Sequence, residues 1–210
     1  MKAFKQILTI LTILIAFVGA KADNGINSPY SRYGLGILAN QSLGVNRQMG
    51  GLGYGLRSDS YINILNPASF SQADTLTMLF EAGFTLQDIY FRENGKGTNA
   101  LNASFDYIAM QFRLCKGLGM SIGFLPYSTV GYSFSSISSA GTQNEYTTTY
   151  AGSGGIYQPY VGLGWQPFKG LSIGATASFI YGDIAHEISY NLTNSDVDNY
   201  KSYTAKLKSY

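Results

Sequence analysis

The residues of this 210-residue chain that could carry acid–base, nucleophilic or metal chemistry are few and widely separated. His186 is the only histidine, and beside Glu187 it is expected at a rim, because a metal centre needs several convergent ligands. Cys115 is the only cysteine, so it has no disulfide partner and no neighbouring histidine to activate it. Glu81 and Asp106 are isolated carboxylates without the spacing of an acid–base pair. We therefore expect no enzyme, no bound metal and no cofactor.

Two glycine-containing stretches superficially match phosphate-binding loops. Residues 51–55 read Gly-Leu-Gly-Tyr-Gly, but Leu56 stands where a dinucleotide loop needs its last glycine, and no strand leads into the stretch. Gly95-Lys96 is followed by glycine rather than by the Ser or Thr of a nucleotide-binding loop. The formal net charge of +2 provides no basic surface. We expect neither a nucleotide site nor a nucleic-acid partner.

The chain does carry the periodicity of strands. In residues 118–124, apolar side chains at even positions alternate with glycine and serine at odd positions, as in a strand with one apolar face. Similar alternation predicts strands at 75–86, 104–114, 118–127, 156–166 and 171–181, the last reaching 190 in a longer reading, with a sixth beginning near Tyr203. Only 12% of residues are charged, and 17 tyrosines and 12 phenylalanines accompany 25 glycines. This composition is typical of a membrane β-barrel whose apolar parity contacts lipid.

The predicted connections alternate between long and short. Residues 87–103, 128–155 and 191–201 are long and polar, whereas 115–117 and 167–170 are short turns. Outer-membrane barrels place long loops outside the cell and short turns in the periplasm. The Ser/Thr/Gly-rich stretch 128–155, whose ends extend the flanking strands, is therefore a candidate surface for a protein partner. Residues 107–118 also align without gaps with residues 160–171, which indicates a repeated hairpin.

The first 22 residues have the features of a secretory signal peptide. Lys2 and Lys5 precede an apolar run at 7–18, and Ala20-Lys21-Ala22 forms a small-x-small cleavage site. The run is short of the roughly 20 residues that a membrane-spanning helix needs. We expect three parts: a signal peptide at 1–22, an N-terminal segment at 23–74 and a transmembrane barrel wall at 75–210, located in the outer membrane.

The number of strands bears on whether the barrel can close. A membrane barrel must close, and known bacterial examples use at least about eight strands. About six strands are expected here, so an all-β, antiparallel outer-membrane barrel that is truncated is the favoured interpretation. The alternative is a complete small barrel whose long connections contain further strands.

The segment before the first predicted strand has a motif suited to a plug inside a barrel. Pro67 removes a backbone donor and forces Asn66 towards extended geometry, so no helix can continue into the strand. Glycines at 50, 51, 53 and 55 allow close backbone packing. An ordinary periplasmic loop is the alternative. The residues assigned to the plug motif are Gly50, Gly51, Gly53, Asn66, Pro67, Ala68 and Ser69.

These residues resemble the FadL/TodX family of outer-membrane transporters in its Bacteroidetes branch. The resemblance covers roughly residues 28–90 and includes the stretch Ser-Pro-Tyr-Ser-Arg-Tyr-Gly at 28–34. It implies a barrel of about 14 strands with an N-terminal hatch, transport of long-chain fatty acids, and partners that are outer-membrane lipid and a hydrophobic small molecule. The alternative function is an interaction or secretion-system component that uses long surface loops.

Overall fold

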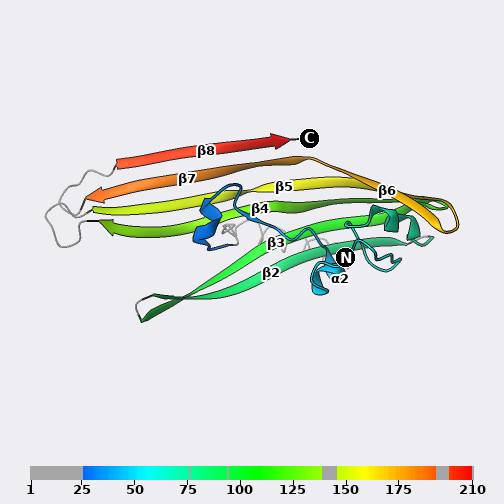
Figure 1. The fold of residues 1–210 in the computed structure, drawn as a ribbon, viewed down its shortest axis with the longest axis horizontal. Helices are drawn as coiled ribbons and strands as arrows, with labels where there is room; N and C mark the ends of the chain where they lie inside the picture. Colours follow the sequence, from blue (N-terminus) through cyan, green and yellow to red (C-terminus); the bar gives the residue numbers. More distant parts are fainter. Residues whose placement is uncertain (1–25, 76, 94, 139–145, 193–198, 210) are drawn as a thin grey trace, which may run out of the picture.

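A computed structural model describes residues 26–75, 77–93, 95–138, 146–192 and 199–209. Its main body is an antiparallel sheet of eight strands (Figure 1). Six of them follow the order β2-β3-β4-β5-β7-β8, and the other two pair beside this path, β1 with β4 and β6 with β5. Among the described residues β2 and β8 do not pair, so the all-β antiparallel fold is confirmed but a closed barrel is not shown. The strands are β1 (Ile37–Leu38), β2 (Met78–Glu93), β3 (Lys96–Cys115), β4 (Leu118–Ser138), β5 (Tyr146–Phe168), β6 (Leu171–Ser178), β7 (Ile180–Leu192) and β8 (Asn199–Ser209).

The strands are longer than their periodicity predicted. The expected loop at 87–103 is strand, because β2 and β3 pair continuously up to Glu93 and Lys96. Most of the expected excursion at 128–155 is also strand, with β4 and β5 paired up to Ser138 and Tyr146. Residues 87–93 and 97–105 show no strict alternation of apolar and polar side chains. In β4 the alternation changes face after Tyr127, so that Val130 and Tyr132 are buried while Ser133 and Ser135 are exposed. The predicted strand 171–181 is divided at Phe179, opposite Pro159, which has no backbone N–H to donate.

β3 and β4 separate along their outer halves. They pair only between Ile108↔Phe124 and Cys115↔Leu118. Beyond that point Asp106 is skipped in the pairing of β3 with β2, and Tyr127 in the pairing of β4 with β5. Such bulges bend a strand and increase its twist. Figure 1 shows the β2–β3 hairpin turning away from β4, and we call the resulting gap the β3–β4 split.

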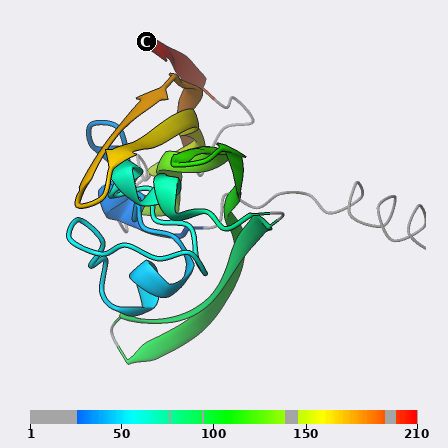
Figure 2. The same ribbon diagram turned by 90° about the vertical axis from the view of Figure 1, so that its right-hand side faces the viewer.

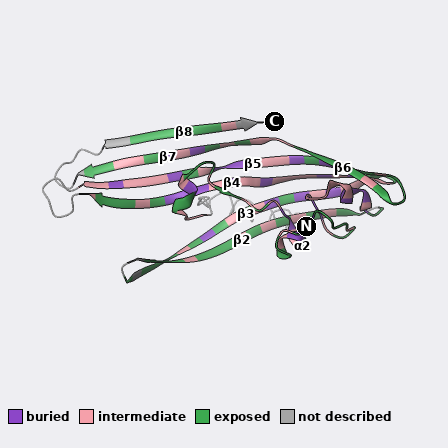
Figure 3. Ribbon diagram, in the orientation of Figure 1, coloured by how far each residue is buried: buried purple, intermediate pink, exposed green. Residues whose placement is uncertain are grey.

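Between the bulges and the short turns, the sheet has one apolar outer face and one buried inner face. The apolar parity that was expected to contact lipid does lie on the outer face. Leu76, which has the same parity as Met78 and Phe80, lies outside the described residues. In the repeated hairpins, Tyr107 and Tyr160 occupy equivalent buried positions on the inner face. Figure 3 shows buried residues recurring along β4 and β5. Exposed apolar side chains of the outer face are Met78, Phe80, Ile108, Leu114, Val161, Leu163, Trp165, Phe168, Leu171 and Ile173.

Apart from the two-residue strand β1, the regular elements among the described residues before β2 are short helices. They are the 3-10 helices η1 (Pro29–Arg32) and η2 (Pro67–Gln72) and the helix α2 (Gly44–Gln48). Within the described ranges, no helix has the length and apolar character needed to cross a membrane. The predicted signal peptide at 1–22 lies outside the described residues.

Candidate functional site

The inner face of the sheet is covered by residues 26–74, which we call the N-terminal segment. Figure 2, viewed at 90° to Figure 1, shows this segment within the curve of the sheet. Burial of apolar side chains drives this contact. The shared cluster contains Leu43, Ile62 and Phe70 from the segment and Tyr107, Ala109, Leu125 and Tyr160 from the sheet.

The sheet beneath η2 is lined with glycine. A Cβ added at Gly119 would overlap the carbonyl oxygen of Phe70, and one at Gly174 would overlap the backbone of Pro67 and Ala68. Only residues without a side chain allow the backbone of η2 to lie this close to the strands. We call Gly119, Gly162, Gly164 and Gly174 the glycine cradle.

Both isolated carboxylates anchor the N-terminal segment. The Glu81 Oε1 atom accepts a 2.8 Å hydrogen bond from the backbone N–H of Ile62. Arg47 Nη1 forms a 2.7 Å ion pair with Asp106 Oδ2, and the Asp106 side chain is only 12% exposed. In the structure, these carboxylates therefore hold the N-terminal segment to the sheet.

Replacing Glu81 should loosen the segment at Ile62. The Glu81→Ala variant leaves the fully buried Ile62 N–H without an acceptor, a loss of about 1–3 kcal/mol. Glu81→Gln is the matched control, because its amide oxygen can still accept the bond. Hydrogen exchange of the peptide spanning residues 58–66 should be faster in the alanine variant only. Equal exchange in the two variants would show that this bond does not hold the segment.

Residues 66–69 of the predicted plug motif lie together at the cradle. Pro67 is the first residue of η2, and the Asn66 Nδ2 atom donates to the carbonyl oxygen of Leu56 at 3.0 Å. Ser69 is buried, and its Oγ accepts from the N–H of Ser58 at 3.2 Å. These hydrogen bonds fix the start of η2, a 3-10 helix that begins at Pro67 rather than ending before it.

The glycines at 50, 51, 53 and 55 were all expected to pack closely against other backbone, and most of them do not. Gly50 and Gly51 have φ values of 74° and 88° and no atom near an added Cβ, so they serve the turn after α2. Gly55 also has open space around it, and only Gly53 packs closely, against Asn63 and Leu65. The structure therefore separates Gly50 and Gly51 from the cradle.

A second buried cluster lies on the outer half of the inner face. His186, expected at a rim, is buried, and its Nδ1 lies 2.6 Å from the Tyr132 hydroxyl. The His186 ring also lies 5.1 Å from that of Tyr203, and the Arg32 guanidinium lies 4.2 Å from the Tyr150 ring. The described ranges hold no group of three or more potential metal ligands, and Cys115 is free and exposed. This cluster attaches η1 to the sheet.

A row of aromatic rings divides the outer face. Neighbouring rings lie 5.3–6.4 Å apart across β2, β3, β4, β5 and β7. On the side of the short turns the outer face is apolar. On the other side, exposed polar residues such as Ser133, Ser153, Asp183 and Glu187 are mixed with exposed apolar ones such as Leu86, Leu101 and Ile137. The row consists of Phe84, Phe105, Phe124, Tyr157 and Tyr181.

Comparison with known families gives one match. The model of the BamG family matches residues 3–210. No curated protein and no solved structure matches the chain. The resemblance to FadL/TodX transporters is therefore wrong, and so is the expected fatty-acid transport. The hydrophobic small-molecule partner and the hatch of such a transporter lose their basis with it. The motif misled because its glycines and Asn-Pro-Ala serve local turns and the packing of η2, which do not specify a transported substrate.

Proposed function

The chain belongs to the BamG family, and from this premise we propose that it is an outer-membrane component associated with the β-barrel assembly (BAM) machinery. It acts through protein contacts rather than through catalysis or fatty-acid transport. The family match over residues 3–210 carries this proposal. It agrees with the alternative function drawn from the sequence, an interaction component, although the expected contact loop at 128–155 is largely strand.

The outer face supports a position in the membrane. From Tyr157 to Phe168 on β5, outward side chains are apolar or aromatic, and this span matches the roughly 9–11 residues of a membrane-crossing strand. Aromatic rings concentrate at the membrane–water interfaces of barrels. We place the aromatic row at the outer interface, the short turns in the periplasm and the outer strand halves beyond the lipid. Export by residues 1–22 belongs to the same proposal.

The inner face supports an interaction role rather than an open pore. The N-terminal segment packs its buried apolar residues against the inner face, and its helix η2 lies in the glycine cradle of the sheet. A packed inner face stiffens the wall and leaves its edges for partners. We propose that residues 26–74 serve as an internal brace.

Depletion of the protein tests this function in cells. Removing it from its host should lower the folded amounts of unrelated outer-membrane barrels, while inner-membrane proteins stay unchanged. Expression of the wild-type chain in full should restore the barrels. Normal levels of folded outer-membrane barrels after complete depletion would contradict a role in their assembly.

A further inference from the structure

The outer half of β3, residues 97–105, forms a strand edge inside the sheet. β4 leaves it at the β3–β4 split, and among the described residues no backbone hydrogen bond is made to this edge. We propose that this edge accepts an extended strand of a BAM-machinery protein by backbone pairing. The inference rests on the proposed function and adds the surface through which the contact is made.

The backbone groups along this edge point into the split. Only two residues separate the paired Glu93 and Lys96, and the pair that flanks such a short hairpin connection exchanges both backbone hydrogen bonds. Alternate residues from Lys96 onwards therefore bond to β2, and the residues between them direct N–H and C=O away from β2. Leu101 and Ala103 belong to this second set. A strand is the one common element that can satisfy such a row of donors and acceptors.

Between Lys96 and the bulge at Asp106, the edge lacks the side chains with which proteins protect exposed strands. Residues 97–105 contain no proline and no charged side chain, although lysine, proline and bulges are the usual guards. Leu101 is 75% exposed and Phe105 is 40% exposed. This edge lies inside the sheet, between β3 and β4. A further strand pairing with β2 or with β8 at the ends of the sheet would therefore not cover it.

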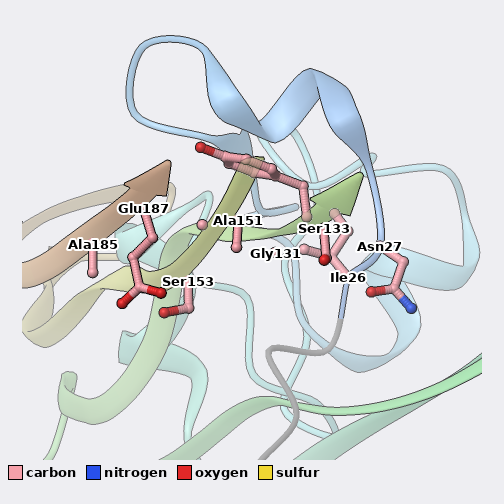
Figure 4. Close-up of a pocket in the computed structure, with 10 residues that line it drawn as sticks. Ile26, Asn27, Gly131, Ser133, Ala151, Ser153, Ala185 and Glu187 are labelled. Carbon is pink, nitrogen blue, oxygen red and sulfur yellow. The ribbon is translucent and has the colours of Figure 1, made fainter. Parts of the chain in front are cut away.

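The opposite side of the split already uses strand pairing. β1 pairs with Ser128 and Thr129 of β4, and the Ser28 N–H donates to the Gly131 carbonyl at 3.0 Å. Figure 4 shows Ile26 and Asn27 beside Gly131 of β4, in a hollow of about 220 Å³. The N-terminal segment thus covers the β4 side of the split.

Contact between the segment and the β3 side is sparse. Asn27 Nδ2 donates to Asn102 Oδ1 at 3.1 Å. A second hollow of about 290 Å³, which Ile26 also lines, lies between Leu38 and Thr129 on one side and Leu86 and Phe105 on the other. The second hollow therefore lies beside the unpaired backbone of β3, on the side of the split that β1 does not cover.

The position of the split relative to the aromatic row also fits an aqueous contact. Phe105 belongs to the row, and the rest of the edge lies beyond it, on the side where polar and acidic residues are exposed together with Leu101 and Leu86. Unpaired backbone is excluded from hydrocarbon but tolerated in water. The wall stays continuous where lipid would surround it and opens where a partner strand can approach.

Two substitutions on the edge test the proposal in the full chain. Ala103→Pro removes one donor that faces the split while leaving the pairing with β2, and Leu101→Lys introduces a guard charge. Ser189→Lys is the matched control, because Ser189 pairs with strands on both sides and lines neither hollow. The BAM barrel subunit recovered with tagged protein from native membranes should fall about tenfold or more in both edge variants and stay unchanged in the control.

The outcomes separate this inference from the proposed function. Failure of the wild-type protein to recover the BAM subunit would contradict the proposed function itself. Recovery by the wild type and equally by both edge variants would overturn only the role of β3. A photo-crosslinker at Leu101 should link to the BAM subunit; a link to the protein's own chain or to a second copy would instead identify another occupant and overturn the proposal.

Discussion

Replacing Gly119 with leucine is expected to release the N-terminal segment from the inner face of the sheet. The new Cβ would overlap the Phe70 carbonyl and lie against the Ser71 backbone, and a rigid strand cannot move aside. Overpacking of this kind costs about 1–3 kcal/mol or more. Trypsin should therefore cleave after Arg57 about tenfold faster or more, since each 1.4 kcal/mol corresponds to a factor of ten.

The control for Gly119→Leu is Ala177→Leu, which adds the same side chain to the exposed outer face of β6. It should leave cleavage after Arg57 at the wild-type rate. Slow cleavage in both variants would mean that η2 does not depend on the glycine cradle.

An arginine in the centre of the apolar outer face is expected to prevent stable membrane insertion. Leu163 projects outwards between the aromatic row and the short turns, and it is 46% exposed. Arginine at the bilayer midplane destabilises a barrel by about 2–4 kcal/mol. Leu163→Arg should sharply reduce the amount of protein that resists alkaline extraction from outer membranes.

Ser153→Arg introduces the same charge beyond the aromatic row and serves as the control. Its extraction-resistant amount should equal that of the wild-type protein. If Leu163→Arg behaves like this control, the apolar face does not contact lipid and the proposed position in the membrane is wrong.

The inner halves of the strands could be predicted because one parity is apolar and the other is small or polar. Met120 and Ile122 alternate with Gly119 and Ser121, and the structure places them on opposite faces. The outer halves could not be predicted in this way, because residues 87–93 and 97–105 lack strict alternation and because the irregularity at Tyr127 moves the apolar residues of β4 to the buried face. Their pairing is decided by the neighbouring strand rather than by local alternation.

The site could be predicted only in part, because its contacts join residues far apart in the chain. Pro67 was expected to keep Asn66 extended, and Asn66 does lie outside helical geometry, but a 3-10 helix begins at Pro67 and continues to Gln72. The partners of Glu81 and Asp106 could not be deduced, since Ile62 and Arg47 meet them only when the segment folds onto the sheet. The glycine cradle is visible in the sequence as glycine that recurs at one parity of the strands. That pattern does not identify η2 as the element that packs against these glycines.

The account depends most on association with the BAM machinery. Tagged full-length protein, expressed at its natural level, should be isolated from gently solubilised outer membranes and its partners quantified. We predict stoichiometric recovery of the BAM barrel subunit, and little recovery when an unrelated barrel carries the same tag. Isolation of the intact, membrane-inserted protein without that subunit would contradict the account.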